Sequence, residues 1–366
     1  MNTEQLKKSK HAKALPAIVQ NLEAIRKDPN GALDITLSEY FQANHQLDMA
    51  GLYQDLGLDP CQDTIQNIVG LPSSDLRWLI PELYRDALRL GLRKSPIYSN
   101  LVAGEQSVKQ TTVKMPAINM SEAVPHQIGI AETIPVGDVS FDQKDVKIHK
   151  IGRGIKVPYE VIQYVSLNLV AIFLQDFGVK MSMGIDSLAI NTLLNGDQAN
   201  GSDSVATIGI NTANTLVFRD LLRTWVRGAR LGKQFSTIIA GENMSMDILD
   251  LLTTTRNFGT PRANVDIKTP IPQNSNLFVH GAVPNNQAII LDNSSALIKL
   301  NAQPLLVETE KIVSNQTEAT YASLTTGFAT IYRDSRIVMD SSLAFAGNGF
   351  PTWMDPSVHE IVTFGK

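Results

Sequence analysis

The sequence predicts a mixed α+β protein in which one extended hairpin is followed directly by one long helix. Residues 131–162 alternate between polar and apolar side chains, with Pro and Gly at both ends, and residues 166–197 have helical spacing. Between 205 and 299, helices alternate with short strands, which indicates a compact α/β unit. Because a long projecting hairpin cannot bury both of its faces in its own domain, we expect it to contact a neighbouring subunit.

The first 100 residues are predicted to be helical and polar. Apolar residues at helical spacing predict one helix over 15–28, which stops at the turn 27–31, and a second over 75–92. Pro81 fits the second helix only near its first turn, where its missing N–H has no consequence. The basic cluster at residues 7–13 is interpreted as a solvated terminus rather than a nucleic-acid contact.

In the hairpin, Val139 and Phe141 point to one face, and Val146 and Ile148 do so after a polar break at 142–145. Basic side chains recur among aspartates, which suits a partner surface with charges of both signs. An ordinary solvated hairpin remains the alternative, since exposed charges need no partner. The side chains predicted to contact a neighbour are Val139, Phe141, Lys144, Val146, Lys147, Ile148, Lys150 and Arg153.

The long helix is predicted to begin after Ser166, whose side-chain oxygen can cap it, and to end at Asn195–Gly196. About 28 residues at about 1.5 Å each give a helix of about 40 Å. Charged residues such as Asp176 and Lys180 exclude a membrane span. Its predicted buried stripe is Leu167, Val170, Leu174, Phe177, Met181, Ile185 and Leu188.

The remaining elements follow from short periodic segments. A helix over 212–232, a strand over 236–240 and a helix over 246–254 capped by Ser245 are expected, followed by strands over 277–280 and 288–291. Two long strands, 305–313 and 317–332, are predicted to flank a turn at Asn315. Residues 337–339 are predicted to complete the sheet of these two strands.

The composition describes an ordinary globular chain of 366 residues, 43% of them apolar and 19% charged. A net charge of −4 gives no general attraction to nucleic acid, so a chain of this composition that enclosed DNA would do so as a container and not as a sequence reader. The single cysteine, Cys61, excludes an intramolecular disulfide. No signal peptide, and no apolar segment long enough to span a membrane, is expected.

No catalytic, cofactor-binding or metal-binding site is predicted. The six histidines are scattered without the spacing of a metal site, and the motifs GxSxG, GxxxxGK[ST] and GxGxxG are missing. We therefore expect a protein that is not an enzyme. A soluble α/β enzyme with an unrecognised site is the alternative from another functional class.

The order of these segments resembles the major capsid proteins of tailed bacteriophages, which have the HK97-like fold. The resemblance lies in the hairpin Ile134–Ile155, in the helix that closes on LLNGD at Leu167–Asp197, and in the segments Phe235–Leu252 and Leu305–Asp340. It covers approximately residues 100–345 and depends on the order and length of the segments.

The resemblance implies a domain organisation. Residues 1–100 would form the N-terminal helical region and arm, and 101–160 the extended hairpin loop. Residues 161–200 and 300–345 would form the peripheral domain with its spine helix, 205–299 the axial domain, and 346–366 a C-terminal tail.

The resemblance also implies a function. The chain would assemble in the host cytoplasm, as pentamers and hexamers, into the icosahedral capsid of a virion around double-stranded DNA. Its partners would be other copies of itself, the packaged DNA without sequence-specific binding, and scaffold, portal and cement proteins, with no cofactor and no membrane. An encapsulin-like shell that packages cargo enzymes is the alternative within the same fold.

Overall fold

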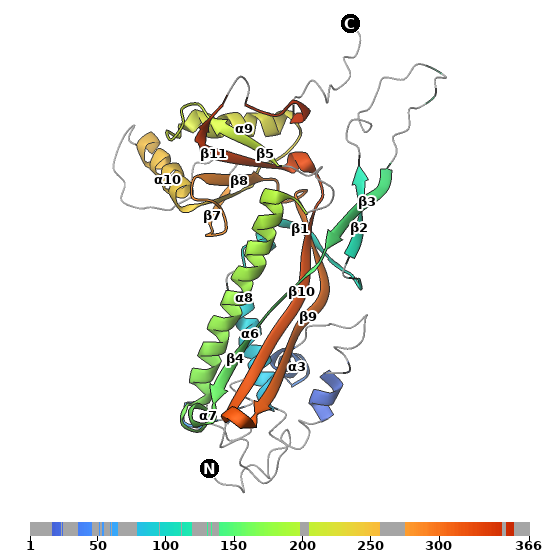
Figure 1. Cartoon of the computed structure of the whole chain (residues 1–366), viewed down its shortest axis with the longest axis vertical. Coiled ribbons are helices and arrows are strands. Elements are labelled where there is room, and N and C mark those ends of the chain that lie inside the picture. Colours follow the sequence, from blue (N-terminus) through green and yellow to red (C-terminus); the bar gives the residue numbers. More distant parts are fainter. Residues whose placement is uncertain are drawn as a thin grey trace. The chain divides into compact units, whose positions relative to one another are not determined.

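The computed structural model describes a chain of two compact units, whose elements are labelled in Figure 1. The first unit contains residues 1–96, 150–185 and 303–325, and the second contains 97–149, 186–302 and 326–366. The described residues are 17–22, 24, 36–45, 51, 53, 54, 59, 61–64, 79–94, 96–110, 112–118, 130, 133, 139–197, 205–256, 275–345 and 349–354.

The main α-helices and the strands have the following bounds. The helices are α3 (Leu37–His45), α6 (Leu79–Arg93), α7 (Tyr159–Tyr164), α8 (Leu167–Asn195), α9 (Phe218–Arg230) and α10 (Glu242–Arg256). The strands are β1 (Val102–Ser107), β2 (Thr112–Ile118), β3 (Val139–Lys147), β4 (His149–Pro158), β5 (Ala206–Ile210), β6 (Thr237–Ala240), β7 (Asn276–Val279), β8 (Gln287–Leu291), β9 (Leu297–Ile312), β10 (Thr317–Thr330) and β11 (Arg336–Ala344).

In the first unit, α6 crosses α8 at a pair of glycines. A Cβ atom on Gly91 would collide with the backbone oxygen of Gln175, and a Cβ on Gly178 would collide with that of Leu88. Each Cβ would also lie within 3.0 Å of the Cα atom of the other glycine. Only glycine lets the two backbones approach this closely. The crossing gives the reason for the presence of Gly178 inside the long helix, where glycine is otherwise unfavourable.

The long strands β9 and β10 belong to a four-stranded sheet with the order β1-β9-β10-β4. The turn between them is the 3-10 segment Val313–Asn315, followed by Gln316 in the left-handed conformation at φ +49°. In the first unit, β4 lies beside β10, where Gly152 and Gly154 leave room for Ser323 and Tyr321. The predicted turn at Asn315 is therefore present, and β4 is an edge strand of this sheet.

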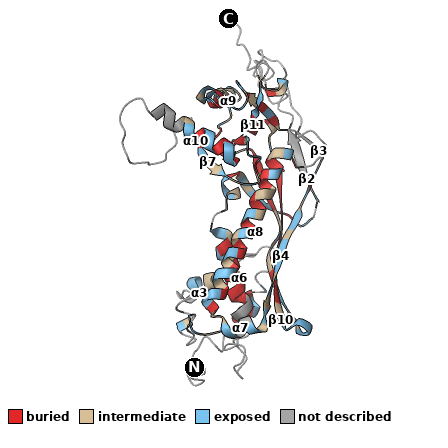
Figure 2. Cartoon of the chain, turned by 60° about the vertical axis from the view of Figure 1, so that its left-hand side comes forward, coloured by how far each residue is buried: buried red, intermediate tan, exposed pale blue. Residues whose placement is uncertain are grey.

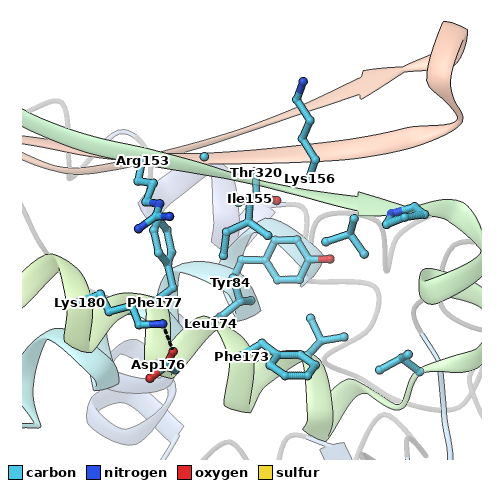
Figure 3. Close-up of a pocket in the computed structure, with 15 residues that line it drawn as sticks. Tyr84, Arg153, Ile155, Lys156, Phe173, Leu174, Asp176, Phe177, Lys180 and Thr320 are labelled. Atoms are coloured by element: carbon cyan, nitrogen blue, oxygen red, sulfur yellow. Dashed lines mark ion pairs between the residues drawn. The ribbon is translucent and has the colours of Figure 1, made fainter.

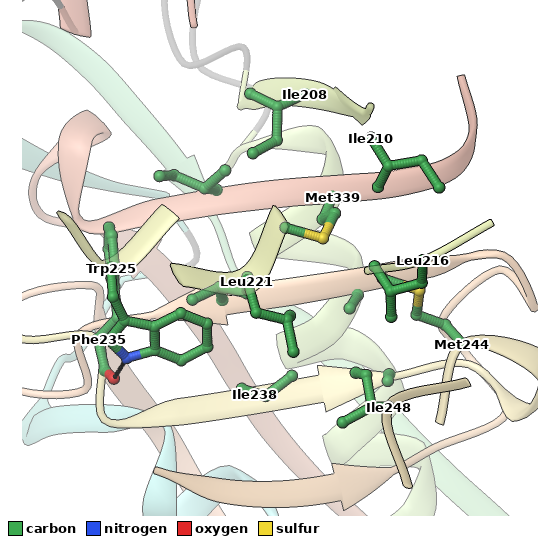
Figure 4. Close-up of a cluster of buried hydrophobic side chains, with 14 of the residues drawn as sticks. Ile208, Ile210, Leu216, Leu221, Trp225, Phe235, Ile238, Met244, Ile248 and Met339 are labelled. Carbon is green, nitrogen blue, oxygen red and sulfur yellow. Dashed lines mark hydrogen bonds between the residues drawn. The ribbon is translucent and has the colours of Figure 1, made fainter. Parts of the chain in front are cut away.

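The second unit is built on a five-stranded sheet with the order β5-β11-β8-β6-β7. Register places Ile337 opposite Ile290, and Ile290 opposite Ile238, so these side chains share one face. That face packs against α9 and α10 through Leu221, Trp225, Met244 and Ile248 (Figure 4). The indole N–H of Trp225 donates to the backbone oxygen of Phe235 at 3.1 Å, which satisfies the one polar atom that this side chain buries.

The prediction that residues 337–339 complete the sheet of β9 and β10 is wrong. These residues belong to β11, which lies between β5 and β8 in the five-stranded sheet. Residues 336–341 are buried on both faces of the strand, as expected for a central strand. The α/β unit predicted over 205–299 therefore also needs residues beyond 299. The strand β5 was not predicted.

The hairpin is formed by different strands from those predicted. β3 pairs with β2, with Thr112 opposite Lys147 and Ile118 opposite Val139. The polar residues 142–145 do not break the strand but lie inside β3. The register shifts between Met115 and Ala117, at Pro116, which has no N–H to donate to the ladder.

The prediction that Ser245 caps a helix is also wrong, because α10 begins three residues earlier, at Glu242. The hydroxyl of Ser245 donates to the backbone oxygen of Gly241 at 2.7 Å, one turn back inside the helix. Gly241 makes the early start possible, since a Cβ there would collide with the backbone oxygen of Pro284. Similarly, α9 begins at Phe218 rather than at 212.

Several predicted features lie partly or wholly outside the described residues. Residues 17–22 and 24 of the helix predicted over 15–28 are helical, and the basic cluster at 7–13 is outside the described part. Of the predicted tail 346–366, only 349–354 are described. The second N-terminal helix is α6, with Pro81 as its third residue.

Within the second unit, the buried carboxylate of Asp186 holds the backbone of Ile97 and Tyr98. Its Oδ1 atom accepts hydrogen bonds from the backbone N–H of Ile97 at 3.1 Å and of Tyr98 at 2.8 Å. Only 1% of Asp186 is exposed. Burial raises the pKa of Asp186 above its ordinary value, although the two N–H groups and the neighbouring His280 act in the opposite direction. The negative charge is therefore unfavourable here, whereas the acceptor oxygen is needed.

We predict that Asp186→Asn, which keeps an acceptor oxygen, changes the free energy of unfolding of the protein by less than about 1 kcal/mol. Asp186→Ala, which removes the acceptor, should lower this free energy by about 2 kcal/mol or more. Because the folded-state pKa is raised, wild type should lose stability relative to Asp186→Asn as the pH rises through that pKa. Urea denaturation over a pH series measures both effects. Equal losses in the two variants would contradict this role.

At the helix crossing, we predict that Gly178→Ala lowers the free energy of unfolding by about 2 kcal/mol or more, because the backbones of α6 and α8 must separate. The matched control is Gly184→Ala in the same helix, where the new Cβ would meet only Ile151 Cγ2, at 3.8 Å. The control should be neutral or stabilising by about 1 kcal/mol through helix propensity. Thermal unfolding of the two variants side by side tests this difference.

Candidate functional site

The base of the β2–β3 hairpin is anchored in a small hydrophobic cluster of its own chain. Val146 is fully buried in it together with Val108, Leu300 and Ala329. Four partly buried side chains complete the cluster: Val113, Ile148, Ile298 and Ala302. The hairpin therefore leaves the second unit from a fixed point.

The structure separates the side chains predicted to contact a neighbouring subunit. Val146 is not available to a partner because it is buried in its own chain, and Ile148 is half-buried beside it. Lys147 is exposed on β3, whereas Lys150 and Arg153 are exposed on β4. The side chains of Val139, Phe141 and Lys144 lie outside the described part, although their backbone is in β3. The predicted group is thus distributed over two strands that belong to different sheets.

The exposed basic residues of these strands are not used within the described part of the chain. Lys147, Lys150, Arg153 and Lys156 form no ion pair with any residue that the structure describes. Four unpaired cations on exposed strands are compatible with either a solvated surface or an acidic partner.

The predicted stripe of α8 faces the interior of the chain. Leu167, Val170, Leu174, Phe177, Met181 and Ile185 are buried, and Leu188 is half-buried. The change from buried to exposed positions along α8 can be followed in Figure 2. The stripe thus makes α8 part of the core.

A second apolar face of α8 was not predicted. Leu169 is 42% exposed, Ile172 51% and Phe173 59%, and all three lie in the first two turns. The sequence did contain the signal, because apolar residues occur all around this part of the helix and not only on the stripe. A helix that is apolar all around is expected to be covered on every side. Within the described residues, this face is uncovered.

A groove lies next to this exposed face in the first unit. Its volume is ≈ 480 Å³, with β4 residues 153–158 on one side and α8 on the other (Figure 3). Tyr84 of α6, Val165 and Thr320 of β10 also line it. Val170, Phe173, Leu174 and Phe177 line it from α8, so its interior is mainly apolar.

Both walls of the groove also carry charged groups. Lys180 and Asp176 form an ion pair of 2.8 Å on the helix side, and Arg153 and Lys156 lie on the strand side. Burial raises the pKa of Tyr84, with the carboxylate of Glu318 acting in the same direction, so its hydroxyl stays protonated. The groove can therefore accept apolar side chains.

The described residues offer no group of three or more His, Cys, Asp or Glu side chains that could hold a metal ion. Nor does any helix among them combine the length and apolar character that a membrane span requires. The candidate functional surfaces of the described residues are the hairpin, the uncovered face of α8 and the groove.

Comparison with known proteins gives one family and several related structures. Residues 142–363 match the family described as phage capsid protein. No curated protein sequence matches the chain. A chain from Microbacterium phage Oxtober96 is similar to this one, with a TM-score of 0.50 and 13% identity, over 67% of this chain and 91% of that chain.

Two further structures are similar. The crystal structure of a virus-like particle from Pyrococcus furiosus has a TM-score of 0.49 and 14% identity, over 70% of this chain and 96% of that chain. The mature capsid of bacteriophage PhiM1 has a TM-score of 0.46 and 9% identity, over 67% of this chain and 87% of that chain.

At the hairpin base, Val146→Ala opens a cavity in the cluster. We predict that this substitution destabilises the unassembled subunit by about 1–2 kcal/mol. It should also lower the protection of the β2 and β3 amides from hydrogen exchange. The neighbouring exposed residue provides the control, since Lys147→Ala removes no buried contact. Unchanged protection in Val146→Ala would show that the cluster does not hold the hairpin.

Proposed function

This chain belongs to the phage capsid protein family, and we propose that it assembles as pentamers and hexamers into an icosahedral shell around double-stranded DNA. The family match confirms the predicted resemblance to phage capsid proteins and the prediction that the chain is not an enzyme. The α+β fold matches that of HK97-like capsid proteins. The protein is a structural component of a virion shell, formed from many copies of one chain.

The observation that carries the proposal at the residue level is the β2–β3 hairpin with its base in the Val146 cluster. A two-stranded ribbon has only marginal stability alone in water, so a partner surface along its length would stabilise it. We assign that surface to a neighbouring copy. Lys147 at the base is exposed and unpaired among the described residues, and it is therefore available to such a contact.

One subunit in both pentamers and hexamers must make the same contacts at slightly different angles. Head-to-tail contacts satisfy this requirement, because each copy offers one surface to the next until the ring closes. Several modest interfaces per subunit then add up to a stable shell. The uncovered apolar face of α8 and the neighbouring groove provide further surface for such contacts.

The enclosed genome is held without sequence recognition in this proposal. A net charge of −4 provides no general attraction to phosphates, so DNA would be retained by the closed shell. Assembly would take place in the host cytoplasm, with scaffold, portal and cement proteins as further partners. The cargo alternative differs only in what the shell contains.

Electron microscopy and size-exclusion chromatography of the expressed protein test the proposal. Closed shells, or rings of five and six copies, are the expected result. Nucleic acid in particles purified after nuclease treatment would favour the genome shell, and co-purifying enzymes would favour the cargo shell. A protein that stays monomeric both alone and in lysate of its infected host would contradict the proposal.

For the hairpin, we predict that Val139→Asp combined with Phe141→Asp abolishes shell formation but leaves a folded, soluble subunit. Two carboxylates on β3 would have to be buried without partners in the interface with a neighbouring copy. Circular dichroism verifies folding, and electron microscopy measures assembly. Normal shells from this variant would exclude the hairpin as an intersubunit arm.

A further inference from the structure

The helix α9 presents an exposed face that is apolar in the middle and cationic at both ends. Leu222 is 37% exposed and Val226 60%, and they lie between Arg219 and Arg230, which are also exposed. Positions 219, 222, 226 and 230 follow the spacing of a single helix face. Within the described part of the chain, the guanidinium groups of Arg219 and Arg230 form no hydrogen bond or ion pair.

The helix α10 presents a face of the same design with the opposite charge. Met246 is 60% exposed and Leu249 41%, and the exposed acids Glu242, Asp247 and Asp250 surround them. The carboxylates of Glu242 and Asp247 have no partner among the described residues. Because the opposite face of α10 is buried on the sheet through Met244 and Ile248, these side chains point outward.

Both helices pack on the same face of the five-stranded sheet, so their outer faces are held by one rigid core. At about 1.5 Å per residue, the α9 face from Arg219 to Arg230 is about 16 Å long, and the α10 face from Glu242 to Asp250 is about 12 Å long. The two faces therefore differ in length by less than one helical turn, and each has an apolar centre flanked by charges, which are positive on α9 and negative on α10. Isolated exposed apolar side chains need no explanation, but two matching stripes on one unit do.

We propose that the exposed face of α9 in one copy docks on the exposed face of α10 in the next copy. This inference rests on the proposed function and names one of its subunit contacts. The partner of each face is a second copy of the chain, because the positive charges of the α9 face complement the negative charges of the α10 face. Opposite potentials across an interface both orient the partners and exclude wrong pairings. After one such contact, the first copy still has an unused α10 face and the second an unused α9 face, so the contact repeats around a ring until it closes.

A helix pair of this length covers less than the roughly 800 Å² per partner of a typical stable interface. The contact therefore cannot hold two copies together alone. It contributes orientation, and it acts together with other contacts of the same subunit through their high effective concentration.

Charge exchange between the two faces tests the proposal. One variant carries Arg219→Glu and Arg230→Glu, the second carries Asp247→Lys and Asp250→Lys, and the third carries all four changes. Glu242 is left unchanged, because an acid in the first turn also stabilises the helix N-terminus. The control variant carries Lys94→Glu and Lys109→Glu, two exposed lysines elsewhere in the chain, and has the same net charge as the first variant.

The yield of assembled particles is measured by sedimentation and electron microscopy, and folding by thermal unfolding of the subunit. Each double variant should lose about tenfold or more in particle yield, because like charges then face each other. The variant with all four changes should recover to within about threefold of wild type, because opposite charges are restored. The control should assemble as wild type does, and all variants should unfold within a few degrees of it.

Other outcomes overturn the proposal in distinguishable ways. If wild type and both double variants assemble equally well, the proposed shell function stands and this contact is wrong. If the four-residue variant stays as defective as the double variants, the faces bind something other than each other. A closed dimer that the charge reversals break would exclude the head-to-tail arrangement. If wild type itself never assembles, the proposed function fails and the inference fails with it.

Discussion

The organisation of the first unit depends on the close approach of two backbones, where Gly91 of α6 meets Gly178 of α8. With no Cβ atom between them, the helices come close enough for Leu88 and Leu174 to be buried to 0% and 5% exposure on either side. The crossing also determines where the wall of the groove lies, since Tyr84 reaches the groove from α6 and Phe177 from α8. Larger residues at the crossing would separate the helices and change the core and the groove together.

The helices could be predicted from the sequence because their signals are local. The stripe of α8 recurs every three or four residues and its end at Gly196 has a positive φ of 77°, so both the element and its C-terminus follow from neighbouring residues. The start of α10 could not be predicted, because Gly241 is required by the backbone of Pro284, which is more than 40 residues away in the sequence. A serine in the right place for a cap was instead one turn inside the helix.

Strand partners were harder to predict, because pairing joins residues that are distant in the chain. The alternation around Val146 correctly indicates a strand, but nothing near it shows that the partner is Val113 rather than a residue of β4. For β11, burial on both faces removes the alternation that would indicate an edge or a surface strand. The prediction of the contact residues was less accurate for the same reason. Val146 was assigned to a contact with a neighbour although it is a core residue, and the exposed faces of α8, α9 and α10 were not predicted.

The anchoring of the hairpin base has a kinetic and entropic consequence. Since Val146 is packed against Leu300 and Ala329 of its own chain, the direction in which the hairpin leaves the unit is determined before a second copy arrives. In the proposed contact with a neighbouring copy, the base of the hairpin does not have to become ordered during association, and the loss of conformational entropy on binding is smaller. Preorganisation of this kind removes one ordering step from the formation of the contact and strengthens the contact without additional contact area.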